Sequence, residues 1–207
     1  MVVVDYGMGN LRSAQKGLEK AGVRAVVSGD PGVVASADGV VLPGVGAFKD
    51  CMDNLRSSGL VKPVLDAIAA DRPFLGICLG MQLMLSVSEE FGMHEGLGVV
   101  PGRVVRFPSG QGRKVPHMGW NRLHLAGQSP LFQGVPEGSF FYFVHSYYAV
   151  PEDDSVVGGW TDYGVRFCSA ISRGRLFATQ FHPEKSHRHG LKILENFSRI
   201  VADYKEG

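Results

Sequence analysis

Short runs of apolar and β-branched residues alternate with amphipathic stretches through the first half of the chain. Buried strands are predicted at residues 2–5, 23–27, 39–42 and 74–77. The stretches 11–21 and 47–70 have the apolar spacing of helices, and we expect Gly22 to end the first and Pro63 to divide the second. Strands that alternate with helices in this way are typical of an α/β fold with a largely parallel sheet.

The pattern changes in the second half of the chain. Another helix is predicted to begin near Leu79, because apolar residues recur at helical spacing as far as Val87. Strand-like segments beyond it are separated by Gly, Pro and Asp and lie at residues 102–107, 140–150, 156–160 and 175–181. A last helix is predicted over 186–204. We therefore predict one α/β domain over residues 1–207, with a mostly parallel central sheet flanked by helices and an additional antiparallel portion.

The charge balance excludes several classes of partner. The chain has 21 Lys and Arg against 20 Asp and Glu, a formal net charge of +1, and no block of like charges. No sequence-wide field attracts phosphate backbones or anionic lipid, so we expect neither a nucleic acid nor a membrane partner. The apolar runs are too short to cross a bilayer, and the first residues do not resemble a signal peptide. We expect a cytoplasmic protein.

The cysteines are few and unpaired in sequence. Cys51, Cys78 and Cys168 form an odd count without a CxxC spacing, which argues against both a disulfide framework and a zinc site. We expect no metal and no cofactor. At least one thiol is free for other chemistry.

The most specific local signal is the run Gly-Ile-Cys-Leu-Gly at residues 76–80, where a buried strand turns directly into a predicted helix. This is the nucleophile-elbow pattern with cysteine in place of serine. Glycine is needed on both sides because the nucleophile occupies a sharp, strained turn. The turn presents the Cys78 thiol to the positive end of the helix and leaves the Leu79 backbone N–H free to face an oxyanion. A buried structural thiol is the alternative.

A second signal is the run Gln-Phe-His-Pro-Glu at residues 180–184, at the end of an apolar strand. In extended chain His182 and Glu184 face the same side, so Glu184 can orient the imidazole while His182 reaches a neighbouring thiol. Surface polar residues are the alternative for an isolated pair, and a metal site lacks a third ligand. His187 and His189 follow in the predicted last helix, where we expect them to be solvated.

A third signal is Leu-Pro-Gly-Val-Gly at residues 42–46, also at the end of a buried strand. Its glycines can present bare N–H groups to an anion or oxyanion. A tight structural turn is the alternative. All three signals lie at strand ends, which would meet at the carboxyl edge of one parallel sheet, where such folds place their sites.

These motifs together resemble the class I (triad) glutamine amidotransferases, whose fold is flavodoxin-like. Further blocks, at residues 5–10, 116–121 and 142–147 and at Lys185-Ser186, are similar to the glutaminase subunits of imidazole glycerol phosphate synthase. The resemblance covers essentially the whole chain. It implies that Cys78, His182 and Glu184 form a catalytic triad that hydrolyses glutamine to glutamate and ammonia.

The resemblance also implies roles for residues around the triad. Backbone N–H groups of Leu79 and Val45 would form the oxyanion hole, with a rearrangement of the 43–46 turn needed for activity. The amino-acid end of glutamine would be bound by Gly46, Gln82, Ser146 and Tyr147. A partner subunit would be contacted by Asn10, Trp120, Tyr142 and Lys185.

The partner implied is a cyclase subunit with a (β/α)8-barrel fold, forming a heterodimer with this chain. Ammonia would pass into the barrel and be used to make imidazole glycerol phosphate in histidine biosynthesis. Two other functions stay open. One is a stand-alone cysteine hydrolase of the same fold, such as a γ-glutamyl hydrolase or a peptidase. The other is a non-catalytic docking subunit, which an intact set of Cys78, His182 and Glu184 disfavours.

Overall fold

The computed structural model describes residues 1–110 and 114–206. The first half comprises β1 (Val2–Val4), α1 (Leu11–Lys20), β2 (Val26–Ser28), α2 (Pro31–Ser36), β3 (Val40–Gly44), α3 (Phe48–Ser57), α4 (Val61–Ala69), β4 (Phe74–Cys78), α5 (Leu79–Gln82), β5 (Leu85–Ser88), β6 (His94–Glu95) and β7 (Val100–Arg106). The second half comprises β8 (His117–Arg122), β9 (His124–Leu125), η1 (Pro130–Phe132), β10 (Phe140–His145), β11 (Tyr147–Pro151), η2 (Asp154–Val156), β12 (Val157–Asp162), β13 (Arg166–Arg173), β14 (Leu176–Thr179), η3 (Pro183–Lys185) and α6 (His187–Glu206).

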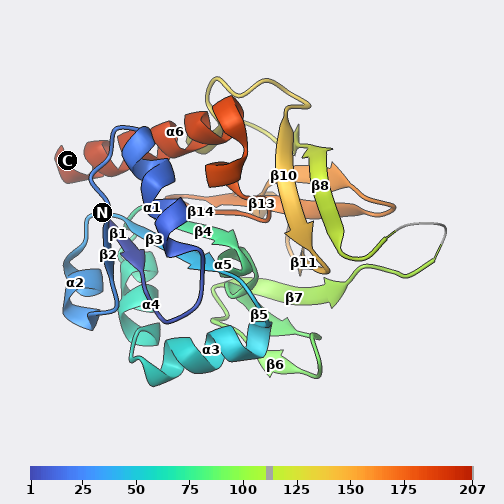
Figure 1. Ribbon diagram of the computed structural model, residues 1–207, viewed down its shortest axis with the longest axis horizontal. Coiled ribbons are helices and arrows are strands. Elements are labelled where there is room, and N and C mark those ends of the chain that lie inside the picture. The colour runs from blue at the N-terminus through green and yellow to red at the C-terminus, as the bar shows by residue number, and fades with distance from the viewer. Residues whose placement is uncertain (111–113, 207) are drawn as a thin grey trace.

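A long central sheet runs through the molecule (Figure 1), with the strand order β2-β1-β3-β4-β14-β13-β11-β7-β5-β6. Its first five strands are parallel, and their order is that of a flavodoxin-like sheet. Strands β13, β11 and β7 then continue the sheet in antiparallel pairs. The predicted parallel core with an antiparallel portion is confirmed.

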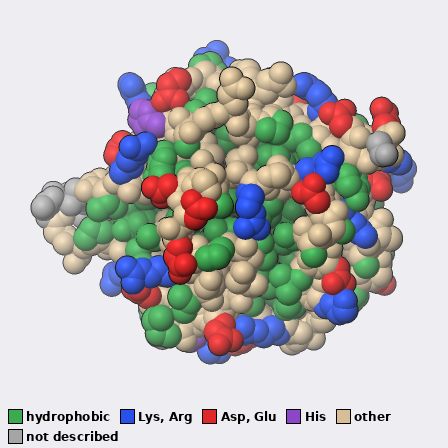
Figure 2. Space-filling view, turned by 180° about the vertical axis from the view of Figure 1, so that it is seen from behind, with side chains coloured by type: hydrophobic (Ala, Val, Ile, Leu, Met, Phe, Trp, Pro, Cys, Tyr) green, Lys and Arg blue, Asp and Glu red, His purple; other side chains and the backbone are tan. Residues whose placement is uncertain are grey.

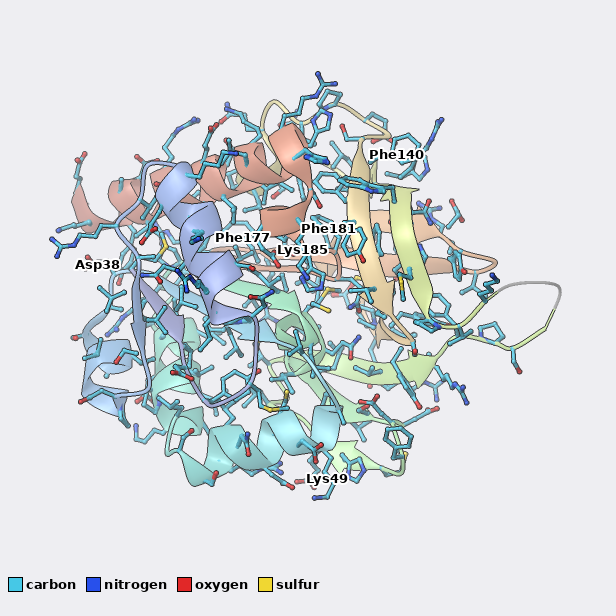
Figure 3. The ribbon with its side chains drawn as sticks, viewed as in Figure 1. Asp38, Lys49, Phe140, Phe177, Phe181 and Lys185 are labelled. Carbon is cyan, nitrogen blue, oxygen red and sulfur yellow. The ribbon has the colours of Figure 1, made fainter. Side chains whose placement is uncertain are left out.

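Helices cover both faces of the parallel strands. Alternate side chains of one strand enter different cores, because successive residues of a strand point to opposite faces. Val41 packs with α1 and α6, whereas Leu42 packs with α2, α3 and α4. Phe177 and Phe181 belong to the core on the side of α1 and α6 (Figure 3). This three-layer arrangement leaves the carboxyl ends of β3, β4 and β14 together at one edge.

Strands β8 and β10 form a separate two-stranded antiparallel sheet beside that edge (Figure 1). Its register pairs His145 with His117 and Tyr142 with Trp120. The segment 140–150, predicted as one strand, is therefore two strands in different sheets. The change of sheet occurs at Ser146, between β10 and β11. Three strands of this half, β8, β9 and β13, were not predicted.

The helix predicted from Leu79 to Val87 is a single turn, α5, followed by β5. Helical spacing is overridden here by tertiary pairing, because the chain forms strand-like bonds with a later segment. The Leu97 N–H donates to the Leu83 carbonyl at 2.8 Å, and the Val100 N–H donates to the Met84 carbonyl at 2.9 Å.

We predicted that Pro63 divides the helical region 47–70. The structure divides it at Gly59 instead. Gly59 has φ +70°, and the Leu60 N–H bonds back to the Leu55 carbonyl at 3.1 Å, which ends α3. Pro63 lies in the first turn of α4, where a missing N–H breaks no helical hydrogen bond. The second strand is also shorter and later than predicted, at Val26–Ser28.

Charges of both signs are interspersed over the face seen in Figure 2, as the balanced composition predicts. Within residues 1–110 and 114–206, no helix combines the length and the apolar character that a membrane crossing requires. The same part of the chain holds no cluster of His, Cys, Asp or Glu that could bind a metal ion.

Candidate active site

Cys78 ends β4 in a strained conformation, with φ +57° and ψ −110°, and begins the single turn of α5. The neighbouring glycines make this turn possible. A Cβ on Gly80 would lie 1.9 Å from the Leu42 carbonyl oxygen, and one on Gly76 would lie 2.8 Å from the Gly80 carbonyl oxygen. The predicted steric need for both glycines is confirmed. Because α5 has one turn only, its dipole is smaller than the longer helix predicted from the sequence would supply.

His182 and Glu184 follow the next parallel strand, β14. His182 Nδ1 and Glu184 Oε1 are 2.8 Å apart, and each side chain is only 3% exposed. The pair was predicted from extended chain, in which residues two apart face the same side. The structure instead brings them together by the 3-10 turn η3, which begins at Pro183. The contact is as predicted, but the local conformation that makes it is not.

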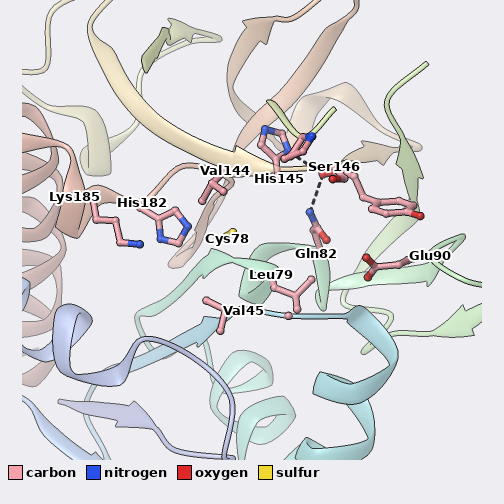
Figure 4. A pocket seen from close by; sticks show the side chains of 13 residues that line it. Val45, Cys78, Leu79, Gln82, Glu90, Val144, His145, Ser146, His182 and Lys185 are labelled. Carbon is pink, nitrogen blue, oxygen red and sulfur yellow. Dashed lines mark hydrogen bonds between the residues drawn. The ribbon is translucent and has the colours of Figure 1, made fainter. Parts of the chain in front are cut away.

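The His182 ring lies between a carboxylate and a thiol. Burial disfavours its charged form, but the neighbouring Cys78 and Glu184 outweigh burial and raise the pKa of His182 to about 10. Within the described residues Nε2 has no hydrogen-bond partner, and the Cys78 sulfur lies beside the ring (Figure 4). The arrangement therefore favours the charged form of His182, with Glu184 fixing the far side of the ring.

A cavity of about 320 Å³ opens over the Cys78 sulfur (Figure 4). It is lined by Val45, Gly46, Cys78, Leu79, Gln82, Glu90, Pro116, Val144, His145, Ser146, Tyr147, His182 and Lys185. All residues expected in the oxyanion hole and the glutamine site are among these lining residues. Lys185, expected at a partner contact, also lines it. Glu184 lies behind His182, and its Oε2 has no hydrogen-bond partner in the described ranges.

The Gln82 side chain is held by two acceptors. Its Nε2 donates to the Tyr147 carbonyl and to Gln180 Oε1, both at 2.9 Å. Both amide protons are therefore used within the protein, and only Oε1 remains for a ligand. Gln180, fully buried at the end of the β14 strand, places its own Nε2 3.8 Å from the Cys78 sulfur.

The turn at residues 43–46 is clamped from two sides. The Tyr6 hydroxyl donates to the Pro43 carbonyl at 2.7 Å, and the Cys51 thiol donates to the Val45 carbonyl at 3.3 Å. Burial raises the pKa of Cys51 to about 11, so its thiol keeps the proton that it donates. A Cβ on Gly44 would lie 2.9 Å from the Tyr6 hydroxyl oxygen, and Gly46 has φ +94°. This turn therefore requires glycine at both positions.

Strand β10 is bonded to the backbone around His182. The His182 N–H donates to the Tyr142 carbonyl at 3.0 Å. The Ser186 hydroxyl accepts from the Tyr142 N–H at 3.0 Å and donates to the His182 carbonyl at 2.6 Å. The position of His182 is thus set by the two-stranded sheet as much as by β14.

The other face of that sheet is exposed and aromatic. Trp120 is 46% exposed and packs edge-to-face on Tyr142, its cross-strand partner. His187 stacks on Trp120 with ring centroids 5.0 Å apart and planes 3° apart. His187 is exposed, as predicted, but its stacking on Trp120 was not predicted. Asn10 lies elsewhere, as the exposed N-cap of α1, where its side chain accepts from the Ser13 N–H.

Comparison with known proteins assigns the family. The family described as "Glutamine amidotransferase class-I" matches this chain over residues 2–201. The chain belongs to the class I glutamine amidotransferases.

Two relatives of this amidotransferase carry the name "Imidazole glycerol phosphate synthase subunit HisH". The protein of Syntrophotalea carbinolica is 59% identical over 202 residues, which cover 95% of this chain and 98% of that protein. The protein of Geobacter sulfurreducens is 55% identical over 205 residues, which cover 97% and 98%. A chain in the structure of PurLQS from Thermotoga maritima has a TM-score of 0.72 at 18% identity and covers 99% of this chain and 97% of that one. This last similarity shows the fold alone.

Sequence reasoning assigned no role to Gln180, beside the Cys78 sulfur, or to Glu90, on the cavity of this amidotransferase. Gln180 lies within the same five-residue run as His182, so that run could have drawn attention to it. Glu90 lines the cavity, and its Oε2 accepts from the Phe48 N–H at 2.6 Å. No local pattern marks Glu90, because the contact joins residues 42 apart in the chain.

Proposed function

We propose that this chain is the glutaminase subunit of imidazole glycerol phosphate synthase, which supplies ammonia for histidine biosynthesis. The observation that carries the proposal is the meeting of the Cys78 elbow with the His182–Glu184 pair at one cavity. Two relatives, 59% and 55% identical, bear the name of this synthase subunit. Their names are the reason why we propose this class I amidotransferase and not another. The biosynthetic role also implies a cytoplasmic location.

The reaction begins at the Cys78 sulfur. His182 Nε2 holds the thiol proton, and the thiolate attacks the side-chain amide carbon of glutamine. His182 then returns that proton to the leaving nitrogen, so that ammonia departs and a γ-glutamyl thioester remains. Water attacks the thioester with His182 as base, and glutamate leaves as the thiol is restored. Glu184 Oε1, 2.8 Å from Nδ1, keeps the ring oriented through both steps.

The developing oxyanion needs donors that do not move during the reaction. We assign this role to the backbone N–H groups of Leu79, which follows Cys78, and of Val45, which follows the end of the neighbouring strand β3. The clamps from Tyr6 and Cys51 hold the turn that contains Val45. A change in this turn would therefore alter catalysis without removing any side chain that holds glutamine.

The amino-acid end of glutamine fits the opposite end of the cavity. Gln82 offers only its Oε1, and Glu90 offers a carboxylate, so these two groups suit the α-ammonium of the substrate. Backbone groups of Gly46, Ser146 and Tyr147 remain for the α-carboxylate. Recognition of both charged groups would exclude amides that lack them.

We place the partner, a cyclase subunit with a (β/α)8-barrel fold, against the exposed face that carries Trp120 and Tyr142. Asn10 and Lys185 belong to the same proposed contact in the heterodimer. The exposed Trp120 and the bonds from Tyr142 to the His182 backbone support this placement, because a partner there could affect the base.

The test is glutamine hydrolysis by the chain alone, with the cyclase subunit, and with that subunit and its nucleotide ligand. We expect slow turnover alone and a large rise in kcat, with a smaller change in KM, in the full complex. Incomplete oxyanion stabilisation costs about 2.7 to 4 kcal/mol, on the order of 100-fold to 1000-fold in rate, which would account for a slow free subunit. Full turnover without a partner would indicate a stand-alone hydrolase. No turnover in any mixture would indicate a docking subunit.

A further inference from the structure

Two buried histidines next to the cavity have no part in the proposed chemistry. His145 ends β10 and lines the cavity, and His117 is its cross-strand partner on β8. His117 Nδ1 and His145 Nε2 are 2.9 Å apart. At the outer end Asn121 Nδ2 lies 3.2 Å from His117 Nε2, and at the inner end His145 Nδ1 lies 2.8 Å from the Tyr147 carbonyl oxygen.

The outer end fixes the direction of this chain of hydrogen bonds. The Asn121 side chain cannot be reversed, because its Oδ1 accepts from the Arg122 N–H at 2.8 Å and its Nδ2 donates to the Asp162 carbonyl at 2.9 Å. The second Nδ2 proton then points to His117 Nε2, which must accept it. His117 therefore carries its proton on Nδ1 and donates to His145 Nε2.

The inner end independently fixes the same direction of the hydrogen bonds. The Tyr147 carbonyl can only accept, so His145 must carry its proton on Nδ1. Each ring thus holds one proton and is neutral, and a second proton on either ring would oppose an existing donor. Burial among aromatic rings agrees with this, since it lowers the pKa of His117 to about 4 and that of His145 to about 3. The positive charge of His182 lowers the pKa of His145 further, and the hydrogen bond to the Tyr147 carbonyl opposes this shift.

The Tyr147 carbonyl connects this pair to the glutamine site. It accepts from His145 Nδ1 at 2.8 Å and from Gln82 Nε2 at 2.9 Å, so both of its lone pairs are used. We propose that His145, held in its Nδ1-protonated form by His117, is a positioning residue that orients the Tyr147 carbonyl and, through it, the Gln82 amide that binds glutamine. This inference rests on the proposed glutaminase function. The inference adds one residue, His145, to the set Cys78, His182 and Glu184. His145 acts on substrate binding and not on the chemical steps.

The consequence is a specific division between binding and chemistry. Without the His145 donor, the Tyr147 carbonyl is held by Gln82 alone, and the Gln82 amide can turn. In the described part of the chain His145 makes no hydrogen bond to Cys78, His182 or Glu184, so the proton transfers are not directly affected. A neutral hydrogen bond of this kind corresponds to about a fivefold to tenfold change in an equilibrium constant. We therefore expect an effect of that size on KM for glutamine, with kcat within about twofold of the parent value.

Three variants test this division in the complex of this chain with the cyclase subunit. His145→Leu removes the donor, whereas His145→Asn keeps an N–H near the position of Nδ1. We expect KM to rise about fivefold to tenfold in His145→Leu and to stay near the parent value in His145→Asn. His124→Leu is the matched control, since His124 Nδ1 bonds Glu137 Oε1 at 2.7 Å and not the site. Equal losses in His145→Leu and His145→Asn, or an unchanged KM in both, would overturn the proposal.

A second measurement does not depend on activity. The parent chain labelled with 15N-histidine should show both His117 and His145 protonated on Nδ1 and unprotonated on Nε2 at pH 7. Loss of one set of signals in His117→Asn and of the other in His145→Asn assigns them. An Nε2-protonated His145 would refute the device even if glutamine is hydrolysed. If the parent complex does not hydrolyse glutamine, the proposed function fails. The measured tautomers still test whether His117 holds His145 in its Nδ1-protonated form.

Discussion

The two sides of the candidate site are held in place by different forces. On the Cys78 side, the backbone itself is forced into position, since a side chain at residue 76 or 80 would collide with a neighbouring backbone oxygen. On the His182 side, the His182 N–H donates to the Tyr142 carbonyl of β10, and the His182 carbonyl accepts from the Ser186 hydroxyl, which also accepts from the Tyr142 N–H. The nucleophile is thus placed by steric exclusion, and the base is placed by directional polar contacts.

This difference predicts different sensitivities. Steric placement tolerates no added volume, but it does not require any distant partner. Placement by hydrogen bonds tolerates small changes of volume, but it responds to movement of β10. A movement of the two-stranded sheet can therefore displace His182 and Gln82, whereas the Cys78 elbow stays fixed.

The largest expected effect is on the Cys78 side, in Cys78→Ala. The variant should lose glutamine hydrolysis in the complex but still make imidazole glycerol phosphate from added ammonium, since only the nitrogen source is removed. Product formation measured with each nitrogen donor checks this. Cys168→Ala is the matched control, because Cys168 is buried in β13 and its thiol, among the described residues, bonds only the Ala170 carbonyl. Glutamine hydrolysis retained in Cys78→Ala would remove this residue from the mechanism.

The next effect separates the two members of the His182 side. His182→Ala removes the group that moves the proton, whereas Glu184→Gln leaves the attacking pair in place, so we expect the larger loss of kcat in His182→Ala. Glu184→Gln should also lower the pKa of His182, because the carboxylate helps to hold it near 10. Rates in the assembled complex across a pH series measure both effects. A larger loss in Glu184→Gln would assign the carboxylate a direct chemical role.

The steric half is tested by Gly80→Ala. A Cβ there lies 1.9 Å from the Leu42 carbonyl oxygen, and neither backbone can yield without disrupting the sheet. We expect a loss of more than about 4 kcal/mol in the free energy of unfolding, measured by urea titration. Gly22→Ala is the matched control, because its Cβ meets nothing within 4 Å and only its φ of +83° is unfavourable. That strain costs about 1 to 2 kcal/mol. Equal losses in the two variants would mean that the elbow is not sterically fixed.

The contrast also explains how far the sequence could predict the molecule. The Cys78 elbow and the strands around it were predictable, because glycine spacing and apolar runs are local signals. The one-turn helix α5 was not, since pairing of residues 83 and 84 with residues 97 and 100 overrides the helical spacing. Glu90 and the His117–His145 pair depend on contacts between distant segments, whereas Gln180 lies in a run that local reasoning had already singled out.

The smallest effect tests the polar side at Ser186, whose hydroxyl joins the Tyr142 N–H to the His182 carbonyl. Ser186→Ala leaves both backbone groups without this partner in a site where Ser186 is 1% exposed. We expect a loss of about 1 to 3 kcal/mol in the free energy of unfolding, together with a lower kcat because His182 is less well placed.

Ser155→Ala is the matched control for that prediction. The Ser155 hydroxyl is exposed and bonds only Asp153 in its own loop, so its removal should change stability by less than about 0.5 kcal/mol. Thermal unfolding and glutamine hydrolysis of both variants decide the point. If Ser186→Ala is as mild as Ser155→Ala in both measurements, the Ser186 hydroxyl does not hold the base against β10, and only the His182 N–H bond to the Tyr142 carbonyl remains for that role. The proposed route from the exposed Trp120 face to His182 would then have to run through another contact.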